Sequence, residues 1–157
     1  KAGVGGQRIG IHLDLMAQAR AHIHARGLAD RVAEYPIDIL RPDTALPDGH
    51  DVIWMSQFLD CFSEQEIEAI LLKIKKNMKP DATIFIMETF IDDQRFPAAE
   101  FSLIATSLYF TAMANGNSKM YSSSVMKYIV DKAGFECIGE HHLHTDSFHT
   151  ILELKLK

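Results

Sequence analysis

Two nearly uninterrupted apolar runs constrain the fold of this chain more than any other feature. Residues 51–58 read DVIWMSQF and residues 82–87 read ATIFIM. Strands that are covered on both faces show such runs, whereas strands with one wet face alternate apolar and polar residues. The two runs therefore predict strands of a largely parallel sheet packed between helices.

Two weaker strand signals precede these runs, at residues 8–13 (RIGIHL) and 31–37 (RVAEYPI). An acid follows each of the four predicted strands: Asp14, Asp38, Asp60 and Glu88. In open α/β sheets, ligands bind where the carboxyl ends of the strands meet. We therefore expect the four acids to converge on one crevice, although an acid at a strand end is also compatible with a solvated loop or a helix entry.

Helix signals separate and follow the predicted strands. They cover residues 15–25, 63–78, 97–114 and 124–133. The second begins with a capping box of Ser63 and Glu66. The third is apolar nearly all round, so we expect it to be buried or to form the wall of a pocket. The tail, residues 135–142 and 148–156, predicts an antiparallel hairpin, and the whole order predicts one α/β domain.

Composition narrows the partners of this domain. The chain has 157 residues, 47% of them apolar, and a formal charge of -5, so no basic surface is available to gather nucleic acid. No apolar run approaches the ~20 residues that cross a bilayer, and no secretory leader is present, so we expect no membrane contact and a cytoplasmic location. Neither the two cysteines nor the histidines near the C-terminus have a metal-binding spacing, so no metal is expected.

The first two acids suit a nucleoside. Asp14 is placed to accept hydrogen bonds from two ribose hydroxyls, because vicinal donors match one bidentate carboxylate. Asp38 offers an acceptor for an exocyclic amine, and Ile39 beside it offers an apolar surface for a flat ring. Together these three residues predict an adenosine site.

Six stretches of the sequence carry a resemblance to known proteins. They are GLADRV (27–32), DVIWMSQFLDCFS (51–63), IMETFIDDQ (86–94), SLYFTAMANGNSKMY (107–121), AGF (133–135) and HTILELKLK (149–157). The chain resembles S-adenosylmethionine-dependent O-methyltransferases of small molecules, the plant phenolic and acetylserotonin group with its bacterial relatives. The resemblance implies a Rossmann-like class I methyltransferase sheet, S-adenosylmethionine as cofactor, a small aromatic acceptor, and a homodimer in the full-length protein.

The resemblance also assigns cofactor contacts. Asp14 matches the acid that holds the ribose, and Asp38 with Ile39 matches the pair that contacts adenine. Ser56 and Gln57 match the strand end beside the cofactor. We therefore expect these five residues to line the cofactor site.

The catalytic position departs from the family pattern. Asp60 stands where the plant enzymes carry a catalytic histidine, and Glu88 matches the acid that orients it. The substrate cavity of the family is lined by the helix that here carries Tyr109, Phe110 and Met113. A free aspartate, with a pKa near 3.9, is a weaker base than histidine, so Asp60 serves as a base only if burial or Glu88 raises its pKa. The alternatives are an acidic phenol that needs little help, catalysis by proximity, or a structural role for Asp60.

Other parts of the family pattern are missing. Only Gly3–Gly6 precedes the second strand, without the first strand that normally leads into the glycine loop, and residues 118–121 lack the second flanking glutamate. The N-terminal dimerisation domain is absent too, so we expect residues 1–157 to be part of a longer catalytic domain. Two other functions remain open: a non-catalytic binding protein derived from the family, and a nicotinamide-dependent oxidoreductase that shares the ribose-binding acid.

Overall fold

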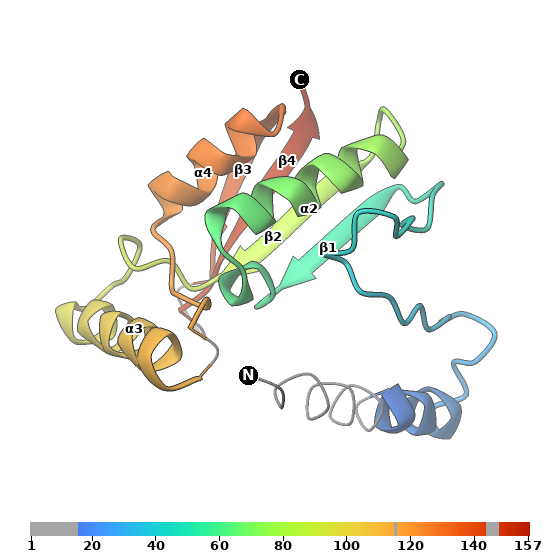
Figure 1. The fold of residues 1–157 in the computed structure, drawn as a ribbon, viewed down its shortest axis with the longest axis horizontal. Coiled ribbons are helices and arrows are strands. Elements are labelled where there is room, and N and C mark those ends of the chain that lie inside the picture. Colours follow the sequence, from blue (N-terminus) through green and yellow to red (C-terminus); the bar gives the residue numbers. More distant parts are fainter. Residues whose placement is uncertain (1–15, 115, 144–147) are drawn as a thin grey trace. The chain divides into compact units, whose positions relative to one another are not determined.

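The computed structural model describes residues 16–114, 116–143 and 148–157, and the chain divides into two compact units, Lys1–Asp38 and Ile39–Lys157. Figure 1 follows the chain from the N-terminus to the C-terminus. Asp14, the predicted strand at residues 8–13 and the glycine-rich residues 3–6 lie outside the described residues.

The first unit contains the helix that the alanine-rich segment predicts. It covers residues 16–25 and ends shortly before Gly27, whose φ of +65° is the left-handed conformation typical of a C-cap glycine. Arg20 on this helix pairs with Glu34, with 2.7 Å between Nη2 and Oε2. The predicted helix and its glycine stop are therefore confirmed.

The strand predicted at residues 31–37 is wrong, because this stretch has no regular secondary structure. A strand is stable only when a neighbour shares its hydrogen bonds, and no described strand pairs with this segment. Pro36 also removes one amide donor from any ladder. Val32 and Tyr35 remain 43% and 56% exposed, so the apolar side chains of the segment find no core in the described chain.

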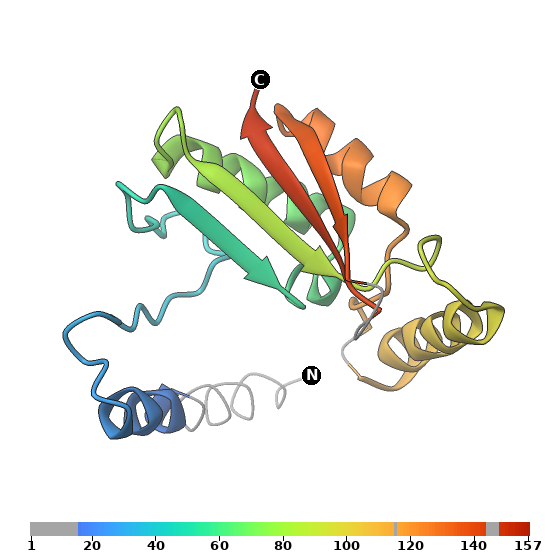
Figure 2. The same cartoon turned by 180° about the vertical axis from the view of Figure 1, so that it is seen from behind.

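The second unit is built on a sheet of four described strands. They are β1 (Val52–Ser56), β2 (Thr83–Glu88), β3 (Phe135–His142) and β4 (Thr150–Leu156). Their order in the sheet is β1-β2-β4-β3; β1 and β2 run parallel, and β4 is antiparallel to both of its neighbours. Figure 2 shows this sheet from the face that the helices behind it do not cover. The two apolar strands and the C-terminal hairpin are thus confirmed.

Two helices, α2 (Glu64–Asn77) and α4 (Ser123–Lys132), cover one face of the sheet (Figures 1 and 2). The apolar stripe of α2 is buried there: Ile67, Ile70, Leu71 and Ile74. On the other face of the described sheet, Trp54 stays 53% exposed beside Phe85, with 5.9 Å between the ring centroids. The core therefore lies between the sheet and these two helices, and the expectation that β1 is covered on both faces is wrong for the described chain.

The connection from β1 to α2 fixes the position of Asp60. A 3-10 turn, η1 (Leu59–Cys61), follows β1, and Leu59 is fully buried. The predicted capping box then starts α2, with the Ser63 N–H donating to Glu66 Oε2 at 2.8 Å and Ser63 Oγ accepting from the Glu66 N–H at 3.4 Å. Asp60 is consequently held between a buried anchor and a capped helix.

The apolar helix α3 (Pro97–Tyr109) continues into a π-helical segment, η2 (Phe110–Ala114), and has no buried residue. Phe101 and Leu108 are 72% and 69% exposed. The expectation that this helix is buried is therefore wrong for the described chain, because no other described element packs over its apolar face. None of the described helices combines the length and apolarity needed to cross a bilayer.

Candidate active site at the carboxyl ends of β1 and β2

Glu88 is the organising residue of this end of the sheet. It is the last residue of β2 and only 3% exposed. Its Oε1 accepts the backbone N–H groups of Phe58 and Leu59, both at 2.9 Å, and its Oε2 accepts from Gln57 Nε2 at 3.3 Å. One carboxylate therefore holds the whole turn that leads from β1 to Asp60.

Gln57 bends the chain into this arrangement. Its φ of +47° lies in the left-handed region, which residues other than glycine rarely adopt. Its backbone N–H donates to Met87 O at 2.9 Å, which extends the pairing of β1 and β2 by one step. The strained residue therefore turns the next two N–H groups toward Glu88, as is common where a backbone is shaped for function.

Burial makes both acids of the site harder to ionise. It is the main cause that raises the pKa of Glu88 to about 7; the charge of Asp60 adds to the rise, and the N–H groups of Phe58 and Leu59 oppose it. Burial also raises the pKa of Asp60, which is half-buried. A role for Asp60 as a base requires a raised pKa. Burial changes the pKa of Asp60 in this direction.

The pKa of the Cys61 thiol depends on the charge of Asp60. Its Sγ donates to Asp60 Oδ1 at 3.5 Å. Burial and the neighbouring carboxylate of Asp60 raise the pKa of this thiol to about 11. Because thiolate is the reactive form, Cys61 is a poor nucleophile near neutral pH.

A pocket of about 510 Å³ lies along β1 and the C-terminal half of α2. Its lining is largely apolar and includes Ile39, Trp54 and Phe58, with Ser56 as one of few polar groups. This volume and lining are typical of sites for small organic ligands. The pocket brings together two residues that the sequence predicts as cofactor contacts, Ile39 and Ser56.

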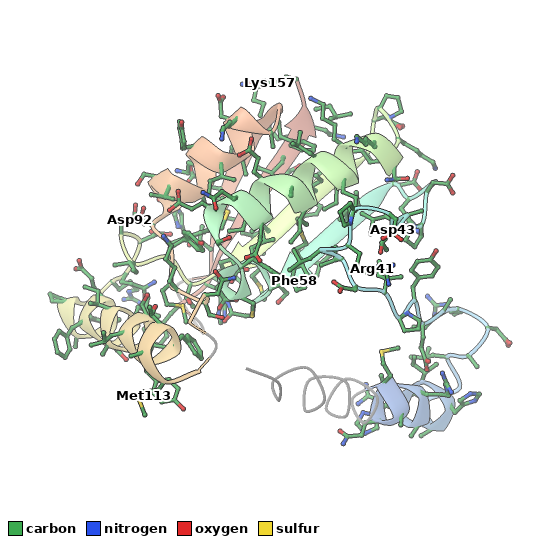
Figure 3. All side chains as sticks on the ribbon, in the orientation of Figure 1. Arg41, Asp43, Phe58, Asp92, Met113 and Lys157 are labelled. Atoms are coloured by element: carbon green, nitrogen blue, oxygen red, sulfur yellow. The ribbon has the colours of Figure 1, made fainter. Side chains whose placement is uncertain are left out.

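Lys73 holds the loop that forms one wall of this pocket. Its Nζ donates to the carbonyl oxygens of Ile39 and Arg41, both at 2.6 Å. Arg41 also pairs with Asp43, at 2.9 Å between Nη2 and Oδ2, and Figure 3 labels this pair together with Phe58. Lys73 on α2 therefore fixes the position of Ile39. No sequence motif indicates this contact.

Within the second unit, the residues predicted to contact substrate do not line this pocket. Asp38 is the exposed last residue of the first unit. Tyr109 and Met113 are 59% and 74% exposed, and Met113 points away from the sheet in Figure 3. Phe110 packs against Tyr109 with 5.9 Å between ring centroids. The assignment of these three aromatic and thioether side chains to a substrate cavity remains a prediction.

The loop after β2 is more structured than the sequence indicates. The position of Asp92 and Asp93 after Glu88 predicts a solvated loop, with a loop that reaches substrate as the alternative; in the structure each also binds another segment of the chain. Asp92 accepts from the Ser123 N–H at 2.6 Å and the Ser124 N–H at 3.4 Å, at the start of α4 (Figure 3). Asp93 binds His142 Nδ1 at 2.8 Å and also accepts from the Thr150 hydroxyl. Asp92 is therefore exposed as expected, Asp93 is half-buried, and only tertiary contacts reveal the partners of both.

Three comparisons place this geometry among known proteins. The model of the O-methyltransferase domain family matches residues 11–136. The mitomycin biosynthesis 6-O-methyltransferase of Streptomyces lavendulae is 30% identical over 117 residues, which are 74% of this chain and 31% of that protein. Among solved structures, the mitomycin 7-O-methyltransferase MmcR matches 90% of this chain and 39% of its own, at a TM-score of 0.74 and 25% identity.

A second solved structure has the same fold at lower identity. The O-methyltransferase NcsB1 from neocarzinostatin biosynthesis, in complex with S-adenosylmethionine and 2-hydroxy-5-methyl naphthoic acid, matches 90% of this chain and 38% of its own, at a TM-score of 0.72 and 16% identity. The chain thus spans about a third of the curated relative that it matches. Because the family model covers most of the sequence, the chain belongs to the O-methyltransferase domain family.

Proposed function

We propose that the protein containing this chain transfers a methyl group from S-adenosylmethionine to a hydroxyl of a small aromatic molecule. The observation that carries the proposal is the buried Glu88 carboxylate, which holds the Asp60 turn at the carboxyl ends of β1 and β2. The names of the relatives support the same chemistry, since mitomycin and naphthoic acid O-methyltransferases act on small molecules.

The residues of the pocket fit the adenosine part of this cofactor. Ile39 and Phe58 offer apolar surface to a flat ring, and the Ser56 hydroxyl offers a polar contact. Asp38 and Asp14 remain the proposed partners of the adenine amine and the ribose. Few polar groups line the pocket, which suits a ring better than a charged group.

When bound, S-adenosylmethionine would supply a methyl group on a sulfonium: an in-line nucleophile would take the methyl carbon, the S–C bond would break, and the neutral thioether of S-adenosylhomocysteine would leave. The chain itself contributes position and a proton acceptor. Glu88 fixes the turn through two backbone N–H groups, and this turn presents Asp60. We propose that Asp60 takes the proton of the acceptor hydroxyl as the new O–C bond forms. Because even a raised carboxylate pKa stays below that of most hydroxyls, an acidic phenol suits this base best.

The substrate contacts and the homodimer are proposals for the longer protein. Tyr109, Phe110 and Met113 lie on α3 and η2, whose water-facing surface is unusually apolar. Exposed apolar surface of this kind supports both the substrate contacts and the homodimer, since such surfaces commonly bind ligands or other proteins. A second function, a non-catalytic cofactor-binding protein, is favoured by one observation only. That observation is the carboxylate of Asp60 where the family's plant enzymes carry a histidine.

Protection against heat tests the proposed cofactor. S-adenosylhomocysteine at about ten times its Kd should stabilise the chain by about 1.4 kcal/mol. For a domain of this size, that energy raises the Tm by roughly 3–5 °C. We expect NAD at the same concentration to leave the Tm unchanged, and protection by NAD alone would favour the oxidoreductase instead. Methyl transfer by the full-length protein, or its absence, then separates the enzyme from a non-catalytic binder.

A further inference from the structure

The two acids of the site lie on different segments, and a third segment, residues 117–121, lies against both. Asp60 belongs to the η1 turn after β1, and Glu88 ends β2. In the family that the chain resembles, a second flanking glutamate lies at the position of residues 118–121. This glutamate is missing here. Its contacts therefore need an explanation other than acid chemistry.

The segment binds the Asp60 turn through its backbone and through one side chain. The Lys119 N–H donates to Asp60 O at 3.0 Å. The phenol hydroxyl of Tyr121 donates to Phe62 O at 2.6 Å. Lys119 also pairs with Glu64 at 2.9 Å, and its Nζ lies 4.7 Å from the centre of the Tyr121 ring. The middle of the short turn and the residue that follows it are thus tied to this segment.

The same segment binds the chain that follows Glu88. The carbonyl oxygen of Tyr121 accepts the Ile91 N–H at 3.0 Å, and the Thr89 hydroxyl lies 3.7 Å from Met120 Sδ. Tyr121 is only 3% exposed. A single buried residue therefore contacts the Asp60 side through its phenol and the Glu88 side through its backbone.

The phenol is suited to a permanent donor role. Burial and the nearby carboxylates of Glu64 and Glu66 raise the pKa of Tyr121 far above its usual range, so the hydroxyl keeps its proton. Its acceptor, the carbonyl of Phe62, lies in the part-buried region between η1 and α2. Losing this donor would leave the carbonyl without that partner, which costs more than the hydrogen bond itself contributes.

We propose that Tyr121 is a positioning residue that fixes the separation of Asp60 and Glu88 by joining the two segments that carry them. The role in methyl transfer rests on the proposed function, because it matters for the reaction only if these acids act in it. The joining of the two segments does not depend on any ligand. Since the interaction of two charges depends on their separation, a change in this link must alter how the acids ionise.

The variant Tyr121→Phe tests the link while keeping the packing of the ring. Without the phenol hydrogen bond the turn loosens, water reaches Glu88 and the Asp60 charge moves away, and both changes lower the pKa of Glu88. Weaker N–H bonds from Phe58 and Leu59 would oppose this fall, but burial is the largest cause of the raised pKa, so we expect the net change to be a fall. We expect the titration midpoint of the Glu88 carboxyl carbon, followed by ¹³C NMR, to fall from about 7 by roughly one unit. The matched control is Tyr128→Phe, at a tyrosine that is 66% exposed on α4.

Cys61 provides a second readout in a Cys137→Ser background. Its thiol pKa of about 11 depends partly on Asp60, so a fall of one unit makes alkylation about tenfold faster near pH 8. If Tyr121→Phe does not fold, Lys119→Ala tests the same link in a chain with Tyr121 intact, because it removes the pair with Glu64 and the contact with the Tyr121 ring, and it must lower the Glu88 midpoint. An unchanged Glu88 midpoint in either folded variant would overturn the proposal. Failure of the cofactor to protect the wild-type chain would instead count against the proposed function.

Discussion

Replacing Glu88 with alanine should lower the free energy of unfolding by about 3 kcal/mol. The carboxylate is the acceptor for the N–H groups of Phe58 and Leu59, and the region around it is buried. Each buried donor that loses its partner costs roughly 1–3 kcal/mol, although water entering the new space recovers part of this. Urea unfolding followed by the single tryptophan, Trp54, measures the loss.

Two controls separate the hydrogen bonds from other effects of this change. Glu88→Gln keeps an acceptor oxygen in nearly the same place, so it should cost less than half as much as the alanine variant at pH 7. Glu136→Ala removes an exposed glutamate from β3 and should change stability by less than about 0.5 kcal/mol. Equal losses in the alanine and glutamine variants would show that the turn does not depend on the carboxylate oxygen.

The second large effect is the part of the pH dependence of stability that the ionisation of Glu88 causes. Its pKa is about 7 in the folded chain and near 4.5 when unfolded, so between these values the folded state binds more protons. Stability must then fall as pH rises from 4.5 through 7, because ionising the buried acid disfavours the folded state. Above about pH 7 the penalty is complete and stays constant.

The comparison with Glu88→Gln isolates this titration from that of all other groups. Between pH 4.5 and 8 the wild-type chain should lose about 3 kcal/mol relative to the glutamine variant, which cannot ionise at this position. Urea unfolding of both proteins at several pH values provides the measurement. A difference that stays constant with pH would mean that Glu88 ionises in the folded state as it does in water.

Local patterns were sufficient to predict most elements of the second unit. The apolar runs that became β1 and β2 and the capping box at Ser63 depend on neighbours in the sequence, so they could be recognised there. The position of Glu88 at the end of β2 is predicted as well, because an acid follows this apolar run, and its role in a site remains a prediction. Its partners are backbone N–H groups, which no side-chain pattern reveals.

The predictions that are wrong share a physical cause: each concerns a feature that depends on distant parts of the chain. Residues 31–37 have strand-like composition, but composition cannot supply the neighbouring strand that a ladder needs. The apolar surface of α3 was correctly recognised, but burial requires a covering element. Contacts that no sequence pattern indicates have the same cause: Asp92 and Tyr121 bind segments about 30 and 59 residues away, and such contacts exist only after folding.

The most direct test of the central claim, that the pocket along β1 binds the adenosine of S-adenosylmethionine, is a calorimetric titration of S-adenosylhomocysteine. It should be carried out on the wild-type chain, on Ile39→Asp, which places a charge in the apolar wall, and on Ile138→Asp, a matched change at a residue 51% exposed on β3. We predict binding to the wild type and to Ile138→Asp, with at least tenfold weaker binding to Ile39→Asp, a loss of about 1.4 kcal/mol. Equal binding to all three proteins, or a wild-type Kd weaker than about 1 mM, would contradict the claim.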